Sequence, residues 1–253
     1  MSAATSPARR QWLRLAAALP ALAAWPALAA ADAADAADAA SAPAEFSAAE
    51  RALFVEPHLA GLKPPLELAY RFSRRGSLEP DLDDRVTLAL AANAAGGCCR
   101  AQARFLSGAE QLELPEVEDA KGNPVILYFL ERDVREMQRR TKGQSGYFRK
   151  RIRMAVAQAA TVRETMLPYA GRRVAAREVE IAPYVDDPLR ARFQGLADKR
   201  YLFTLAPAVP GGVYAIATRV AGPAVGAPPL VAEELLADGA TTTLARLGGP
   251  GPT

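Results

Sequence analysis

The residues that could perform catalysis are few in this chain of 253 residues. It has a single histidine, His58, in the sequence Glu56-Pro57-His58-Leu59. A Ser-His-acid triad would have to use this imidazole, but no Gly-x-Ser-x-Gly segment is present to position the serine. A Gly-rich phosphate-binding loop is also absent. We therefore expect His58 to lie in a surface loop, and we expect no catalytic residue and no cofactor.

The two cysteines are adjacent, at Cys98 and Cys99, and follow Gly96-Gly97. Their spacing is not the Cys-x-x-Cys of thioredoxin-type redox proteins. With one histidine and one pair of cysteines, a zinc site is not expected, and we predict no metal. In an oxidising compartment, adjacent cysteines can form a disulfide with each other, pair between chains or remain free. A disulfide between Cys98 and Cys99 in a loop is thus one of three outcomes.

Carboxylates gather in two short segments, residues 79–84 and 186–188. Acid–base catalysis needs two carboxylates in different environments, and a calcium site needs about six oxygen ligands. The first segment lacks the glycine of a calcium loop, and the second ends in Pro188, as turns commonly do. Turn and cap roles are expected, and a carboxylate-dependent hydrolase that uses residues 81–84 or Asp186 is a minor alternative.

The densest charge lies in residues 139–153, which hold seven basic and no acidic residues, with Tyr147 and Phe148 between them. Such a segment could bind the phosphate or carboxylate of a lipid head group, an acidic small molecule or an acidic protein partner. It could equally be a solvated face balanced by nearby acidic residues. We take Arg149, Arg151 and Arg153 as the candidate ligand-binding residues of this segment.

The N-terminal 31 residues have the features of an export signal. Arg9 and Arg10, with Arg14, form a positive start, residues 13–28 are an Ala/Leu-rich stretch, and small residues that fit an A-x-A cleavage site follow. The sequence Arg9-Arg10-Gln11-Trp12-Leu13-Arg14 resembles the twin-arginine export motif, although the general secretory route remains open. We expect a signal peptide at residues 1–31, a periplasmic location and no transmembrane segment in the mature chain.

Net charge bears on the partners of the mature chain, and composition indicates where its folded domain begins and ends. Without the three arginines of the signal, the 31 basic residues fall to 28, equal to the 28 acidic ones, so we expect no nucleic-acid partner. Residues 32–45 repeat Ala and Asp with little to bury and are expected to be a linker. Residues 239–253 are rich in Gly, Pro and Thr and are expected to be a flexible tail. A single β-rich domain is predicted between them, at residues 46–238.

Within this domain, alternation of apolar and polar residues predicts strands. Leu68, Tyr70 and Phe72 alternate with more polar residues, as do Val86 and Leu88. Similar short runs separated by turn residues occur at 101–107, 111–118, 161–167, 174–183, 200–206, 213–220 and 230–236. Short strands with close turns are typical of an antiparallel sheet.

One predicted helix stands out in the middle of the chain. Asn123 and Pro124 are typical of a helix start, and Gly143 of a helix end, so residues 124–142 are predicted to be helical. Residues 147–160 fit a helix or a strand, and the helix is favoured. The predicted fold class is α+β, with a mainly antiparallel, curved and half-barrel-like sheet packed against one or two helices.

Several stretches together resemble a family of uncharacterised exported proteins of Gram-negative bacteria. They are Asn123-Pro124 with Phe129-Leu130-Glu131-Arg132-Asp133-Val134, then residues 147–153, then residues 201–203 and 209–214, and the resemblance covers roughly residues 50–236. The order of strands and helices looks, more loosely, like the curved-sheet lipoprotein carriers and receptors. That resemblance implies a sheet that cups an acyl chain beneath its helices, and it bears on fold more than on function.

The functional expectation is a non-enzymatic periplasmic protein that binds a lipid or another apolar ligand within the curved sheet. Leu68, Tyr70, Phe72, Val86 and Leu88 would line the pocket, and the basic segment would lie near its mouth. The alternative is an accessory module of a cell-envelope complex. It would bind a partner protein through an exposed patch of Tyr147, Phe148 and the arginines.

Overall fold

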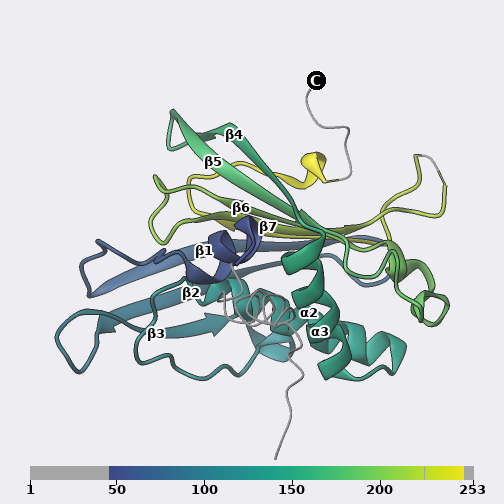
Figure 1. The fold of residues 1–253 in the computed structure, drawn as a ribbon, viewed down its shortest axis with the longest axis horizontal. Coiled ribbons are helices and arrows are strands. Elements are labelled where there is room, and N and C mark those ends of the chain that lie inside the picture. The colour runs from purple at the N-terminus through teal and green to yellow at the C-terminus, as the bar shows by residue number, and fades with distance from the viewer. Residues whose placement is uncertain (1–45, 225, 248–253) are drawn as a thin grey trace, which may run out of the picture. The chain divides into compact units, whose positions relative to one another are not determined.

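The computed structural model describes residues 46–224 and 226–247, and these form one α+β unit (Figure 1). Eight antiparallel strands make a single curved sheet that does not close into a barrel. The predicted fold class is therefore confirmed. The signal peptide expected at residues 1–31 and the linker expected at residues 32–45 lie outside the described residues.

The sheet is built from two meanders joined side by side. The first contains β1 (Leu66–Arg75), β2 (Leu82–Ala92) and β3 (Cys98–Phe105). The second contains β4 (Thr161–Tyr169), β5 (Arg172–Ile181), β6 (Arg200–Leu205), β7 (Val213–Val220) and β8 (Val231–Ala237). The strand order is β3-β2-β1-β8-β7-β6-β5-β4, so the last strand pairs with the first and leaves β3 and β4 as edges.

The alternating apolar residues of β1 and β2 face the core, as the sequence predicts. Leu68 pairs with Leu88 and Tyr70 with Val86 across the two antiparallel strands. All four side chains are buried on one face of the sheet, together with Phe72.

Helices cover this face (Figure 1). A short helix α1 (Ala48–Glu50) continues into one π-helical turn, η2 (Arg51–Val55), and the main cover is α2 (Val125–Thr141) and α3 (Ser145–Gln158). The side-chain oxygen of Asn123 accepts a hydrogen bond from the N–H of Val125, which satisfies one donor at the start of α2. Both helices predicted from the sequence are confirmed, including the ambiguous second one. None of the helices among the described residues is both long and apolar enough to span a membrane.

A glycine allows the close turn between α2 and α3. Lys142 ends α2 in the left-handed conformation, with φ 56°. A Cβ atom on the next residue, Gly143, would lie 2.6 Å from the ring of Phe148. Only glycine therefore lets this ring pack back under the loop.

Two predictions of local structure need correction. Residues 111–118 form no strand and make only isolated bridges to β3, Ala101 to Val117 and Phe105 to Leu112, because Pro115 lacks the N–H that a continuous ladder needs. A flexible tail was also predicted at residues 239–253, but those of its residues that the structure describes, 239–247, contact the sheet. The hydroxyl of Thr243 donates to Glu234, and Leu247 packs against Leu202 and Ala217 on the face opposite the helices.

Candidate functional site

The five sheet residues expected to line a pocket are packed as core. Leu68, Tyr70, Phe72, Val86 and Leu88 are each at most 5% exposed and belong to one apolar cluster with residues of the helices. The hydroxyl of Tyr70 accepts a hydrogen bond from the amide of Asn123 at 2.8 Å, and Phe72 lies under the guanidinium of Arg132. None of the four hollows described below is lined by any of the five. A ligand must therefore be sought elsewhere.

The largest of these hollows is a groove on the outer side of the helices, which we call the helix groove. It holds about 640 Å³. Its lining comes from α1, η2, α2, α3 and the segment before α2: Glu50, Phe54, Leu114, Pro115, Leu127, Tyr128, Leu130, Glu131, Val134, Arg135, Arg149, Ile152 and Arg153. Two of the three arginines chosen from the sequence, Arg149 and Arg153, are among them.

The floor of the helix groove is apolar because one stripe of α2 is only partly covered. Leu127, Leu130 and Val134 are spaced three and four residues apart and so lie on one side of the helix. Leu130 and Val134 are buried against α3, whereas Leu127 remains 57% exposed. Phe54 of η2 faces the same groove and is 40% exposed. Large apolar side chains exposed together in a concavity are typical of a binding surface.

Arginines and one glutamate form the polar rim of the helix groove. Glu131 accepts hydrogen bonds from Arg149 at 2.8 and 2.9 Å and from Arg135 at 3.2 Å. These contacts, chiefly the one with Arg149, hold the pKa of Glu131 below its ordinary value. Glu50 closes a capping box with Ser47 at the start of α1. Arg153 makes no ion pair with the described residues, and it is exposed.

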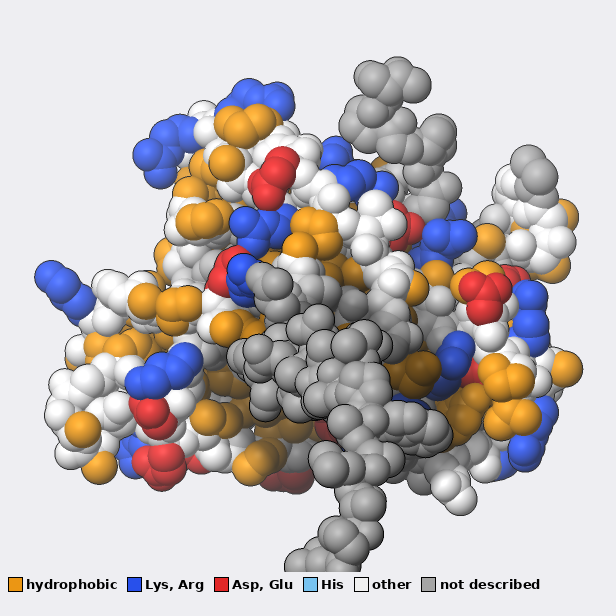
Figure 2. Space-filling model, in the orientation of Figure 1, with side chains coloured by type: hydrophobic (Ala, Val, Ile, Leu, Met, Phe, Trp, Pro, Cys, Tyr) orange, Lys and Arg blue, Asp and Glu red, His pale blue; other side chains and the backbone are white. Residues whose placement is uncertain are grey.

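The rest of the basic segment does not form one patch. Arg139 and Arg140 both pair with Glu79 and Glu136, and Arg151 pairs with the buried Asp187 at 2.7 Å. Figure 2 shows Lys and Arg side chains scattered over the visible face, several of them beside acidic ones. Four of the seven basic residues of the segment are therefore paired with acidic residues within the fold.

The aromatic residues of the segment have structural roles. Phe148 is fully buried and packs edge-on against Tyr184 and Phe193, with ring centroids 5.9 and 5.6 Å away. The hydroxyl of Tyr147 donates to Asp187 at 2.7 Å. The exposed patch expected for the alternative function therefore lacks its phenylalanine. A hollow of about 290 Å³ nearby is lined by Lys142, Tyr147, Phe148, Leu189 and Arg192, among others.

The two carboxylate segments act in turns and ion pairs. Asp83 pairs with Arg75 at 2.7 Å, and Asp84 accepts a hydrogen bond from the backbone of Ser107 at 2.8 Å. Asp187 accepts one from the backbone of Leu189 at 2.7 Å. Across the part of the chain that the structure describes, no group of three or more His, Cys, Asp or Glu residues is arranged to hold a metal ion.

Cys98 and Cys99 are joined by a disulfide at the start of β3. Cys99 is buried, and its backbone oxygen accepts a hydrogen bond from Ala120 at 2.8 Å. The cysteine pair thus lies at the junction between β3 and the segment that leads into α2.

A group of charged residues that sequence reasoning missed lies between the helices and the sheet. Asp133 of α2 is buried and accepts hydrogen bonds from Lys199 and from the hydroxyl of Tyr201. Burial raises the pKa of Tyr201, so its phenol stays protonated and can donate. Nearby, the buried Arg132 pairs with Glu233 at 3.0 Å. No local pattern in the sequence marks these partners, which are distant along the chain.

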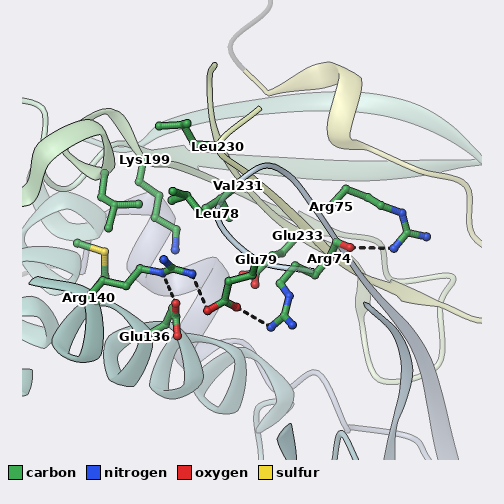
Figure 3. Close-up of a pocket in the computed structure, with 12 residues that line it drawn as sticks. Arg74, Arg75, Leu78, Glu79, Glu136, Arg140, Lys199, Leu230, Val231 and Glu233 are labelled. Atoms are coloured by element: carbon green, nitrogen blue, oxygen red, sulfur yellow. Dashed lines mark hydrogen bonds and ion pairs between the residues drawn. The ribbon is translucent and has the colours of Figure 1, made fainter. Parts of the chain in front are cut away.

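Figure 3 shows the hollow beside this group, with Arg140 and Arg74 both directed at Glu79. The Glu79 carboxylate lies 2.6 Å from Arg140 and 2.9 Å from Arg74. Lys199 and Glu233 also line the hollow, which holds only about 10 Å³. That is about the space of one water molecule, so the hollow is no site for an organic ligand.

His58 is tied into the structure at both ring nitrogens. Nε2 lies 2.8 Å from the backbone oxygen of Ala52, and Nδ1 accepts the backbone N–H of Asn123 at 3.2 Å. This arrangement fits a neutral ring with its proton on Nε2. Burial lowers the pKa of His58, the contact with Ala52 and the charge of Glu56 opposing it more weakly. A hollow of about 350 Å³ lies beside the ring, with Glu56, Glu164 and Arg177 in its wall. His58 is thus a structural residue of the loop before β1.

The lowered pKa of His58 predicts a pH dependence of stability. The unfolded chain takes up a proton near pH 6.5, the ordinary value for histidine, whereas the folded chain takes it up only at lower pH. The contribution of neutral His58 to the free energy of unfolding is therefore complete above pH 6.5 and is lost as the pH falls through the folded-state pKa of this residue. In urea titrations from pH 7.5 to 4.5, the wild type is expected to lose more stability below pH 6.5 than His58→Asn, which does not titrate. Parallel curves for the two proteins would contradict this role.

Comparison with known proteins gives no relative: no family model, curated protein or solved structure matches the chain. The resemblance to exported Gram-negative proteins and to lipoprotein carriers stays an expectation. The function must be argued from the helix groove itself.

Proposed function

We propose that the protein is a non-enzymatic periplasmic protein that binds a lipid or another apolar ligand, and that the ligand lies in the helix groove. The single observation that carries this proposal is the exposed apolar floor of Phe54 and Leu127 in a groove of about 640 Å³. Ligand sites commonly measure about 300–1,000 Å³ and combine apolar walls with a few polar groups. The helix groove has both properties.

The proposal moves the ligand from the concave face of the sheet to the outer face of the helices. The sheet face is already covered by α2 and α3, whose residues fill the core against Leu68 and Phe72. A ligand there would require the helices to separate. The helix groove needs no such rearrangement, because Leu127 is exposed in the folded chain.

The periplasmic location rests on the export signal expected in the sequence. The disulfide between Cys98 and Cys99 supports it, because disulfides persist in oxidising compartments. Fractionation of cells that express the full chain tests the location: the protein is expected in the periplasmic fraction with its first residues removed. Recovery of the uncleaved chain from the cytosol would contradict it.

The alternative function, an accessory module of an envelope complex, has weaker support. It requires Phe148 and the arginines to be available at the surface. Phe148 is buried, and Arg149 and Arg151 are held by Glu131 and Asp187.

Replacing Leu127 by aspartate tests the proposed site. A charge in the middle of the apolar floor would have to be desolvated by an acyl chain, so we expect binding of a twelve-carbon fatty acid to weaken at least tenfold. The measurement is titration calorimetry with the purified full chain. Leu189→Asp is the matched control, since Leu189 is also exposed but lies outside the helix groove. Equal affinities of Leu127→Asp and the wild type would remove the helix groove as the site.

A further inference from the structure

The charged groups around the helix groove are not equally available to a ligand. Of the two acidic residues in its wall, Glu131 is occupied by Arg149 and Arg135, and Glu50 by the backbone of Ser47. Of the three arginines, Arg135 and Arg149 are the ones that Glu131 holds. Arg153 is exposed and has no ion pair within residues 46–224 and 226–247. The rim therefore offers a ligand one uncommitted positive charge.

The position of Arg153 relates this charge to the apolar floor. Ile152 and Arg153 lie three and four residues after Arg149 on α3, so the three residues share one side of the helix. All three line the helix groove. Ile152 belongs to the floor and is buried, whereas Arg153 next to it is at the rim. An apolar tail on Ile152 and Leu127 would thus place its polar end within reach of the Arg153 guanidinium.

The size of the helix groove limits the number of tails. Its 640 Å³ lie within the roughly 300–1,000 Å³ of sites that bury one small organic ligand. A single acyl chain with its head group is a ligand of that size, whereas a phospholipid with two chains is larger.

We propose that the ligand is a single-chain amphiphile with an anionic head group, of the free fatty-acid class, and that Arg153 binds the head group. This inference rests on the proposed function of the helix groove and specifies its ligand. Arg153 donates charge-assisted hydrogen bonds to the carboxylate. The tail lies over Ile152 and Leu127 toward Phe54.

The test compares three twelve-carbon probes that differ only in charge: dodecanoate, dodecanol and dodecylammonium. Each is titrated below its micelle-forming concentration into the wild-type chain, Arg153→Glu and the control Lys150→Glu. Lys150 is exposed on the same helix, has no ion pair within the described residues and does not line the helix groove. Its reversal makes the same change in net charge outside the site.

For the wild type and Lys150→Glu, we expect dodecanoate to bind about tenfold more tightly than dodecanol. Dodecanol has no carboxylate and so loses one charge-assisted hydrogen bond with Arg153. In Arg153→Glu, dodecylammonium should bind more tightly than dodecanoate. Equal binding of dodecanoate and dodecanol would overturn the anionic head group and leave the proposed function standing. An unchanged preference in Arg153→Glu would overturn the role of Arg153.

Two further outcomes separate this inference from the proposed function. If none of the three probes binds and vesicles of phosphatidylglycerol do not bind either, the proposed function itself fails. If only the vesicles bind, the ligand is a two-tailed lipid surface, and the single-chain inference is overturned.

Discussion

Replacing Lys199 by methionine is expected to lower the free energy of unfolding by about 3–5 kcal/mol, the usual result of breaking a buried ion pair. Lys199 and Asp133 are both about 1% exposed, and the ammonium group is bound directly to the carboxylate. Without the lysine, the negative charge of Asp133 would remain in the core with only the hydroxyl of Tyr201 as its partner. The residual cost is that of a buried and poorly solvated charge.

Urea unfolding of the purified variants measures this effect. Arg190→Met is the control, because Arg190 pairs with Asp198 at the surface, at 3.2 Å, and such pairs contribute at most about 1 kcal/mol. Adding Asp133→Asn to Lys199→Met should recover part of the loss, since asparagine is neutral and still accepts from Tyr201. An unfolding midpoint of Lys199→Met equal to that of the wild type would show that the pair is not buried as the structure has it.

Truncating Phe148 to alanine is expected to cost about 3–5 kcal/mol of stability, as for other fully buried aromatic side chains. The ring lies at the centre of the cluster formed with Tyr147, Tyr184 and Phe193. Its loss leaves a cavity beneath the turn between α2 and α3, where Gly143 lies against it. Edge-to-face contacts with all three of these rings are lost as well.

Phe54→Ala separates a structural from a binding role for the aromatic residues. Phe54 is 40% exposed in the helix groove, so its truncation should cost less than about 1 kcal/mol and should weaken fatty-acid binding. Thermal unfolding and calorimetry of the two variants are measured side by side. If Phe148→Ala were as stable as the wild type while losing a protein partner, the basic-aromatic patch would have to be reconsidered.

Local signals allowed most of the elements to be predicted. In β1 and β2 the buried residues alternate without interruption, and α2 begins and ends with residues that favour those positions. The prediction failed at residues 111–118 and 239–247. There, the apolar-polar pattern suggested a strand and the composition suggested a flexible tail, but the outcome depended on contacts with β3 and with Glu234.

The sequence could not predict whether the inner face of the sheet is packed by core residues or lines a pocket, because apolar and polar residues alternate in the same way in both cases. Side chains from α2, such as Phe129, belong to the same buried cluster as Leu68 and Phe72, and Phe72 lies under Arg132 of α2. Only the packing of the helices decides this. For the same reason, the sequence showed Leu127 as part of an apolar stripe but not that α3 leaves it uncovered.

Ion pairs within one helix can be read from the sequence, whereas ion pairs between distant segments cannot. Glu131 and Arg135 form an ion pair four residues apart on one helix, a spacing that can be read from the sequence. Arg132 also lies four residues from an acidic residue, Glu136, but it is buried and pairs with Glu233 of β8 instead. The partners of Arg151 and Asp133 also come from distant segments. A charged segment therefore looks like a binding surface until its tertiary partners are known.

The most direct test of a ligand in the helix groove is to locate the ligand. A twelve-carbon fatty acid with a photoactivated diazirine near its tail end would be bound to the full chain, irradiated and mapped by mass spectrometry of the digest. We expect the label on Phe54, Leu127 or Ile152, and expect excess dodecanoate to suppress it. Labelling of Leu68, Phe72 or Val86 would place the acyl chain between sheet and helices and would contradict the assignment.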